Sequence, residues 1–159
     1  MSGSEIIETA LKENRSLFEP EAYRLLEEYG IPVLDYRLAE SADAAGKLAA
    51  EVGFPVAMKI VSPDVIHKSD SGGVELDIAD AAAAAEAYQT IVKNVSTSVD
   101  NPDIKGVLIV PMISGGTEVI TGMIRDPQFG PAVMFGLGGI FVEILKDVVF
   151  GIAPVSREE

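Results

Sequence analysis

The sequence has no cysteine and a single histidine, and both scarcities restrict the chemistry open to it. Without cysteine, disulfides and cysteine-ligated metal sites are excluded. A zinc site would have one imidazole at most and would have to rely on carboxylates, which structural zinc rarely does. If the chain holds a metal, the expected one is magnesium.

Long hydrophobic runs and an N-terminal signal are also missing. The longest apolar stretches, such as 107–110 and 140–142, are far shorter than the ~20 residues that a membrane-spanning helix needs. Residues 1–5 have neither the basic nor the apolar region of a signal peptide. We therefore expect a cytoplasmic chain without a membrane segment.

Basic residues are few, with 12 Lys and Arg against 25 Asp and Glu, for a formal net charge of −13. No basic patch is visible, and this argues against a nucleic-acid partner. A nucleotide can still bind where a few cations are focused in one cleft, and Lys59 with Lys68 form a candidate pair. With 159 residues, 48% of them hydrophobic, the chain should fold into one core or two small lobes.

Residues 1–105 predict a lobe that mixes helices and strands. Helical spacing, N-cap residues and apolar runs mark each expected element. The expected helices are 5–12, 20–29 ended by Gly30, a helix capped by Ser41 through Glu51, and one capped by Asp80 to about Ser96. The expected strands are 31–34, 56–61 and 74–78.

The polar segment 98–105 resembles a solvated loop, and we place the boundary between the lobes at its end. Strand-like segments separated by Gly and Pro follow it, at 106–113, 118–125, 131–135, 141–145 and 148–153. The predicted class is α/β, with lobes 1–105 and 106–159. Clefts between two such lobes are common small-molecule sites.

The histidine, His67, begins the run 67–74, HKSDSGGV. An imidazole among hydroxyls, a lysine and two glycines can act as a base, a metal ligand or a phosphoryl acceptor near neutral pH. The competing interpretation is a surface histidine beside a glycine turn, because Gly-Gly pairs mostly serve turns.

Lys59 lies inside the apolar strand 56–61, where a lysine is costly unless its ammonium reaches solvent or an anion. A phosphate partner would explain it; the alternative is a lysine on the wet face of an edge strand. Further phosphate contacts can come from Lys68, the hydroxyl groups of Ser69 and Ser71, and backbone amides near Gly72 and Gly73.

Two later segments can serve a nucleotide. Residues 110–112 end an apolar strand in which backbone groups of Val110 and Met112 could meet an adenine edge, and Glu118 could accept hydrogen bonds from ribose hydroxyls. A strand that simply leads into a turn is the alternative. After the glycines of 136–139, Glu143 and Asp147 are candidate magnesium ligands, although a glycine-rich turn is equally compatible.

Taken together, segments 56–63, 67–74, 106–112, 116–120 and 136–147 resemble the ATP-grasp domain of ADP-forming acyl-CoA synthetases, which is the β subunit in two-subunit members of the acetate–CoA ligase type. The resemblance runs from about Ser16 to Ser156. It implies an ATP-grasp fold of two α+β lobes closing on ATP. The implied reaction converts acyl-CoA, ADP and phosphate into a carboxylic acid, CoA and ATP, or the reverse.

The resemblance also implies roles for individual residues. Lys59 matches the phosphate-binding lysine, residues 110–112 the adenine hinge, Glu118 the ribose carboxylate, and Glu143 with Asp147 the magnesium site. His67 matches a proposed station of a phosphohistidine relay. ATP or ADP and Mg²⁺ are then the expected cofactors.

Two departures from the family pattern define what else is expected. The sequence has no CoA-binding fingerprint and no second histidine, so acyl-CoA and the other phosphohistidine should belong to a CoA-ligase α subunit or domain, in a hetero-oligomer. The sequence also ends soon after the Glu143 segment, which suggests a C-terminal truncation. The alternative functions are a non-catalytic ATP-grasp-like module attached to an acetyltransferase, or a ligase acting through an acyl phosphate.

Overall fold

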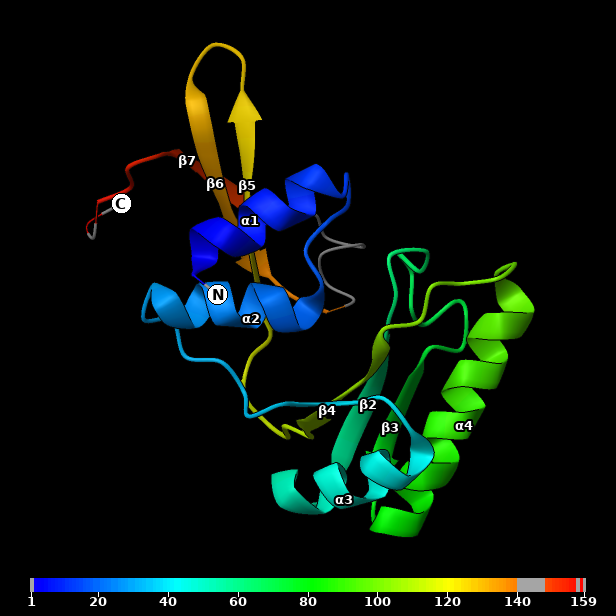
Figure 1. The fold of residues 1–159 in the computed structure, drawn as a ribbon. Coiled ribbons are helices and arrows are strands. Elements are labelled where there is room, and N and C mark those ends of the chain that lie inside the picture. Colours follow the sequence, from blue (N-terminus) through cyan, green and yellow to red (C-terminus); the bar gives the residue numbers. More distant parts are fainter. Residues whose placement is uncertain (1, 140–147, 157, 159) are drawn as a thin grey trace. The chain divides into compact units, whose positions relative to one another are not determined.

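The computed structural model describes residues 2–139, 148–156 and 158. Helices and strands are mixed in the first part of the chain, and the described elements of the last part are all strands (Figure 1). In order they are α1 Gly3–Lys12, α2 Glu19–Glu28, β1 Arg37–Ala39, α3 Ala42–Val52, β2 Val56–Val61, β3 Val74–Ile78, α4 Ala81–Ser98, β4 Gly106–Pro111, β5 Val119–Asp126, β6 Gly130–Leu137 and β7 Val148–Ile152.

The chain forms two compact units, Met1–Ile113 and Ser114–Glu159. The division therefore falls after Ile113, whereas the sequence placed it at the end of the 98–105 loop. The difference has one cause: β4 pairs with β1 and β2 in the first unit instead of joining the later strands.

The first unit contains a four-stranded antiparallel sheet in the order β1-β4-β2-β3. Strand β2 lies between β4 and β3, with Lys59 opposite Leu108 on one side and Val74 on the other. Because β2 is an interior strand, the interpretation of Lys59 as an edge-strand lysine is wrong.

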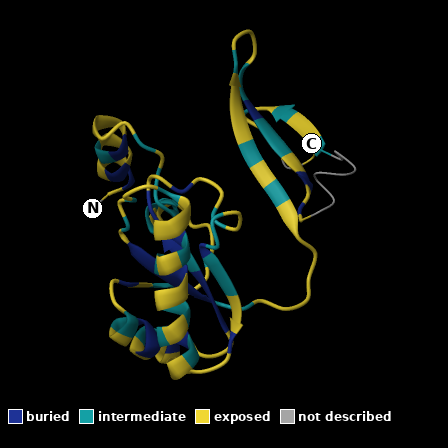
Figure 2. Cartoon of the chain, turned by 90° about the vertical axis from the view of Figure 1, so that its right-hand side faces the viewer, coloured by how far each residue is buried: buried dark blue, intermediate teal, exposed yellow. Residues whose placement is uncertain are grey.

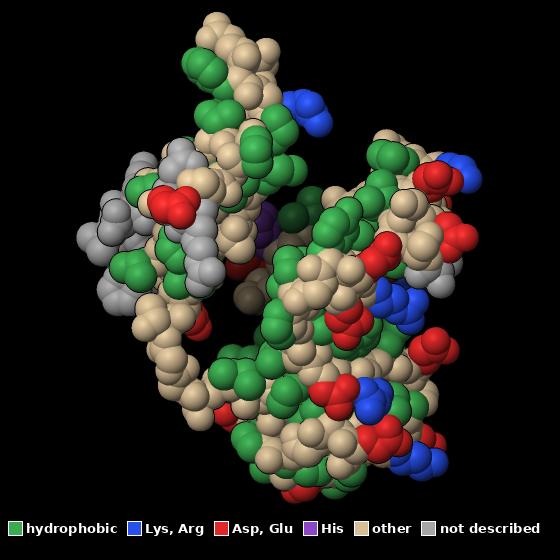
Figure 3. All heavy atoms as spheres, turned by 90° about the vertical axis from the view of Figure 1, so that its left-hand side faces the viewer, with side chains coloured by type: hydrophobic (Ala, Val, Ile, Leu, Met, Phe, Trp, Pro, Cys, Tyr) green, Lys and Arg blue, Asp and Glu red, His purple; other side chains and the backbone are tan. Residues whose placement is uncertain are grey.

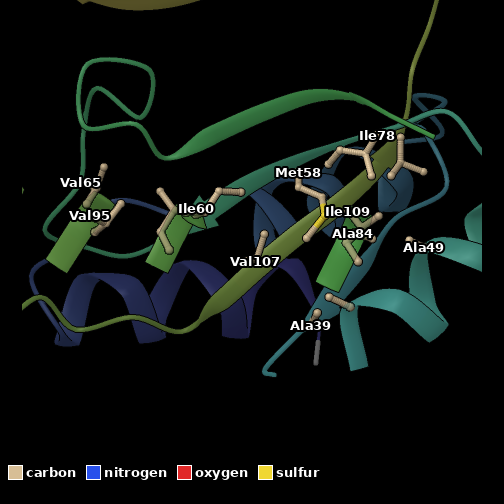
Figure 4. Packing of buried hydrophobic residues seen from close by; sticks show 13 residues of the cluster. Ala39, Ala49, Met58, Ile60, Val65, Ile78, Ala84, Val95, Val107 and Ile109 are labelled. Carbon is tan, nitrogen blue, oxygen red and sulfur yellow. The ribbon is translucent and has the colours of Figure 1, made fainter. Parts of the chain in front are cut away.

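Helices α3 and α4 pack on one face of this sheet and enclose the main core (Figure 4). Met58 and Ile60 of β2 point into this core, together with Ile109 of β4. The two helices also approach each other closely: a Cβ placed on Gly46 of α3 would lie 2.7 Å from the carbonyl oxygen of Ala81.

Local capping explains where several helices begin and end. Ser41 and Asp80 cap α3 and α4 by accepting hydrogen bonds from Ala44 N–H and Ala83 N–H, as predicted. Gly30, at φ +72°, ends α2, as predicted.

The predicted strand at 31–34 is wrong. The amide of Ile31 donates to the carbonyl of Leu26 and so completes the C-terminal turn of α2. Pro32 has no amide to donate to a neighbouring strand. The short strand β1 begins instead at Arg37, where β4 supplies a partner.

The second unit is an antiparallel sheet in the order β5-β6-β7. The strands predicted at 118–125, 131–135 and 148–153 are present with slightly different ends, and the predicted strand 141–145 lies outside the described residues. Large apolar side chains of this sheet are exposed, among them Met123 at 68% and Val149 at 65% (Figures 2 and 3). No helix among the described residues is long and apolar enough to cross a membrane.

Candidate functional site

The first group of candidate residues lies on the sheet face opposite the main core. Side chains alternate along a strand, so Lys59 shares this face with Ala57 and Val61. The face is apolar there, because Ala57 and Val61 form a second buried cluster with Leu108 and Val110. Lys59 thus emerges from an apolar surface, with 30% of its side chain exposed.

The described partner of Lys59 is a carboxylate. Glu19, the first residue of α2, accepts a hydrogen bond from Lys59 Nζ at 2.8 Å on one oxygen and from Lys68 Nζ at 2.8 Å on the other. The hydroxyl of Tyr23 donates to the same oxygen as Lys59, also at 2.8 Å. One carboxylate therefore brings together two lysines that the sequence had assigned to phosphate binding.

The environment of Glu19 keeps it ionised. Burial alone would raise the pKa of this carboxyl, but the hydrogen bonds from Lys59 and Lys68 outweigh burial and lower the pKa to about 2. Burial, followed by the hydrogen bond to Glu19, raises the pKa of the Tyr23 hydroxyl. At neutral pH the cluster of two ammonium groups and one carboxylate has a net charge of +1.

The loop between β2 and β3 places Lys68. The amide of Gly73 donates to the carbonyl of Lys68 at 2.7 Å, and the amide of Ile60 donates to the carbonyl of Gly73 at 2.8 Å. Gly72, at φ +65°, turns the chain, and its amide donates to the carbonyl of Ser69 at 3.1 Å. The two glycines thus tie the loop to β2, and the amides of both are already engaged within the loop.

His67 lies in the middle of this loop, directly before Lys68, and is exposed. Its carbonyl accepts a weak hydrogen bond from the Ser71 hydroxyl at 3.4 Å, while its imidazole has no hydrogen bond or ion pair among the described residues. An unrestrained imidazole beside Lys68 is compatible with a phosphoryl acceptor and equally with a surface histidine. The role of His67 therefore stays a prediction.

A cavity of about 570 Å³ adjoins the two-lysine cluster within the first unit. Its walls are residues 13–19, which lead from α1 into α2, together with residues 61–66 at the end of β2 and Lys68. Glu19 and Lys68 both line it. The cavity gives a small ligand access to Glu19 and Lys68, whereas Lys59 and His67 are not among its lining residues.

The predicted adenine hinge lies at the end of β4. Val110 is buried opposite Ala57, and the amide of Met112 donates to the carbonyl of Pro55 at 3.0 Å. That amide is therefore engaged within the protein. Strand β1 pairs with β4 only as far as Ile109. Backbone groups of β4 that could bind an adenine would therefore come after Ile109, on the edge that β1 leaves uncovered.

Glu118 belongs to the second unit, where it is exposed next to two glycines. The amide of Gly138 donates to the carbonyl of Glu118 at 2.8 Å, and a Cβ on Gly139 would lie 2.6 Å from a carboxylate oxygen of Glu118. The predicted magnesium ligands Glu143 and Asp147 lie outside the described residues. Within the part of the chain that is described, no three His, Asp or Glu side chains gather as a metal site.

Sequence reasoning missed Glu19. Its position in the first turn of a helix has an ordinary explanation, because acidic side chains there favour the helix dipole. Lys59 and Lys68 lie 40 and 49 residues away in the sequence. No local pattern could have revealed the contact.

Comparison with known proteins places the chain in a family. The ATP-grasp domain family matches residues 9–159. The chain is 56% identical, over 98% of its length, to the β subunit of acetate–CoA ligase [ADP-forming] I from Pyrococcus furiosus, and it covers 67% of that subunit. The chain belongs to the ATP-grasp family of ADP-forming acetate–CoA ligases.

Solved structures agree with this assignment of the ATP-grasp chain. The dinucleotide forming acetyl-coenzyme A synthetase 1 of Ca. Korarchaeum cryptofilum, in complex with coenzyme A, Ca-AMPCP and HgCl⁺, superposes with a TM-score of 0.93 at 47% identity, over 99% of this chain and 69% of its own. The same enzyme with coenzyme A and Mg-AMPPCP has a phosphohistidine segment pointing towards the nucleotide binding site; its TM-score is 0.81 at 41% identity, over 99% and 67%. The ATP-grasp chain thus spans about two thirds of these relatives, and its predicted fold class is confirmed.

Proposed function

We propose that this chain is the nucleotide-binding component of an ADP-forming acyl-CoA synthetase. Lys59 and Lys68 bind the phosphates of ATP or ADP, and His67 carries a phosphoryl group between the nucleotide and a partner. The observation that carries the proposal is that one carboxylate holds Lys59 of β2 together with Lys68 of the HKSDSGG segment.

The proposed step is a reversible phosphoryl transfer. In the direction of ATP synthesis, the N–P bond of phosphorylated His67 breaks with its electron pair left on nitrogen, an oxygen of the ADP β-phosphate forms the new P–O bond, and one proton taken up from solvent leaves the imidazole neutral. The lysines offset the negative charge of the phosphates during this exchange. Magnesium, held by Glu143 and Asp147 in this proposal, would neutralise further phosphate charge.

A second protein or domain must supply the rest of the reaction. The only histidine of this chain can be one station of a relay, so a CoA-ligase subunit or domain would bind acyl-CoA and carry the other phosphohistidine. The phosphohistidine segment described for the acetyl-coenzyme A synthetase of Ca. Korarchaeum cryptofilum supports such a partner.

Labelling with γ-phosphate-labelled ATP and magnesium tests the relay. We expect acid-labile, base-stable label on the wild-type chain, with or without the CoA-ligase partner, and none on His67→Asn. A matched Asn94→Ala variant, which alters a polar side chain of α4 next to Gly72, controls for loop disturbance and should keep the label. Equal labelling of His67→Asn would overturn the relay, and nucleotide binding without label on any variant would favour a non-catalytic module.

A further inference from the structure

Glu19 uses both of its carboxylate oxygens to hold lysines that come from different elements. Lys59 belongs to an interior strand and Lys68 to the loop that follows it. The Glu19 side chain is 20% exposed, while those of Lys59 and Lys68 are 30% and 28% exposed. The carboxylate thus lies deeper than the two ammonium groups that it joins.

The lysines keep donors for another anion. An ammonium group has three N–H donors, and each lysine gives one of them to Glu19. Both side chains are partly exposed, and Lys68 lines the 570 Å³ cavity. A phosphate can therefore bind the pair while Glu19 remains in place.

Without Glu19, the pair would not be expected to stay together. Lysine side chains are long and flexible, and two like charges repel each other when close. A phosphate would then have to order both side chains when it binds, at a cost in affinity. A carboxylate that holds them in advance removes much of that cost.

Glu19 is itself well anchored. Arg15 makes two hydrogen bonds to Glu21, at 2.7 and 2.9 Å, and its guanidinium lies 4.0 Å from the centre of the Phe18 ring. The amide of Phe18 also donates to Glu21 at 2.8 Å. These contacts fix the first turn of α2 independently of the lysines, so Glu19 is presented by a preformed support.

We infer that Glu19 is a positioning residue: it gathers Lys59 and Lys68 into a preassembled cation pair that receives the phosphates of a nucleoside diphosphate or triphosphate. The inference rests on the proposed nucleotide site and adds a residue to it. Because the nucleoside does not need the lysine pair, the effect of Glu19 should be confined to ligands that carry phosphates.

The test compares ADP with adenosine on the purified chain by calorimetry. Glu19→Gln removes the charge, and Glu19→Asp keeps the charge but shortens the side chain so that it cannot span both lysines. We expect ADP affinity to fall about tenfold for Glu19→Gln and about threefold for Glu19→Asp, with adenosine affinity unchanged. Glu27→Gln makes the same charge change on an exposed residue of α2 and should leave ADP affinity unchanged.

The outcomes separate this inference from the proposed function. Lys59→Met should weaken ADP binding; if it does not, the phosphate site itself is misplaced. If Lys59→Met weakens ADP binding while Glu19→Gln and Glu19→Asp leave it unchanged or tighten it, the positioning role alone is refuted. Equal losses for ADP and adenosine would mean general damage to the fold and would also overturn the positioning role. Glu19→Asp, which keeps the ion pair in part, provides the answer if Glu19→Gln does not fold.

Discussion

Among single residues, the informative feature is the ion cluster of Glu19 with Lys59 and Lys68, which stabilises the fold and also forms part of the proposed phosphate site. Lys59 would be costly in an apolar strand face without an anion, and Glu19 supplies that anion within the chain. The cluster of Glu19, Lys59 and Lys68 keeps a net positive charge, and Glu19 and Lys68 line a cavity. A residue that stabilises the fold can thus also prepare a phosphate site.

Acid should remove the contribution of Glu19 to stability. Its pKa is about 2 in the folded chain against an ordinary value of 4.5, so the stabilisation is complete above about pH 4.5 and is lost as the pH falls towards 2. We expect the stability advantage of the wild-type chain over Glu19→Gln to shrink by roughly 1–2 kcal/mol between pH 6 and pH 3. Urea unfolding of both proteins at the two pH values measures it.

Comparing wild type with Glu19→Gln separates the acid response of Glu19 from that of the other carboxyls. Glu21 and Asp126 also have lowered pKa values, Glu21 chiefly through Arg15 and Asp126 chiefly through the amide of Phe129. Both are present in wild type and variant, so their acid response cancels. A wild-type advantage that stays constant from pH 6 to pH 3 would contradict the prediction.

At the scale of elements, the loop after β2 depends on a close backbone approach. A Cβ on Gly73 would lie 2.6 Å from Cγ2 of Ile60 and 3.0 Å from the carbonyl oxygen of Lys68. Ile60 is fully buried, so it has little room to move. A side chain at position 73 must therefore shift the loop that carries Lys68.

Gly73→Ala should accordingly lower both stability and ADP affinity. We expect a loss of about 1–3 kcal/mol in the free energy of unfolding, from overpacking against Ile60, measured by urea denaturation. Gly122→Ala is the matched control, because its Cβ would make only an ordinary contact, 3.6 Å from the Cε of Met134. Equal losses in the free energy of unfolding for Gly73→Ala and Gly122→Ala would refute the importance of the close approach between Gly73 and Ile60.

The elements also show where local sequence patterns succeed. Strands β2 and β3 and the caps of α3 and α4 were predicted because an apolar run or an N-cap residue acts on its own neighbours. The segment 31–34 was wrongly predicted as a strand because its apolar residues match a strand pattern. The amide of its first residue, Ile31, donates instead to the C-terminal turn of α2. A strand needs a partner, and no local pattern specifies one.

At the scale of the whole molecule, the two units differ in how they are stabilised. Among the described residues, every buried hydrophobic side chain except Ala132 lies in Met1–Ile113. The second unit has several exposed large apolar side chains on three strands. Burial of apolar surface is the main stabilising term in folding, so the first unit should be far more stable by itself.

Separate expression of the two units checks this expectation. Residues 1–113 should unfold cooperatively on heating, followed by circular dichroism, whereas residues 114–159 should show no cooperative transition because small sheets need a buried face. The intact chain, heated under the same conditions, is the control. A cooperative transition in the isolated 114–159 segment would contradict the prediction.

Features that depend on near neighbours followed from the amino-acid order: the helix caps, the end of α2 at Gly30, the buried strand β2, and the ordered motifs that identify the ATP-grasp family. The pairing of β4 in the first unit and the contact of Glu19 with Lys59 and Lys68 became evident in the folded chain alone. The physical reason is the separation along the sequence over which each interaction acts. A cap acts on residues three or four positions away, whereas the two-lysine cluster joins side chains 40 and 49 residues apart, which only the completed sheet and α2 bring within hydrogen-bonding distance.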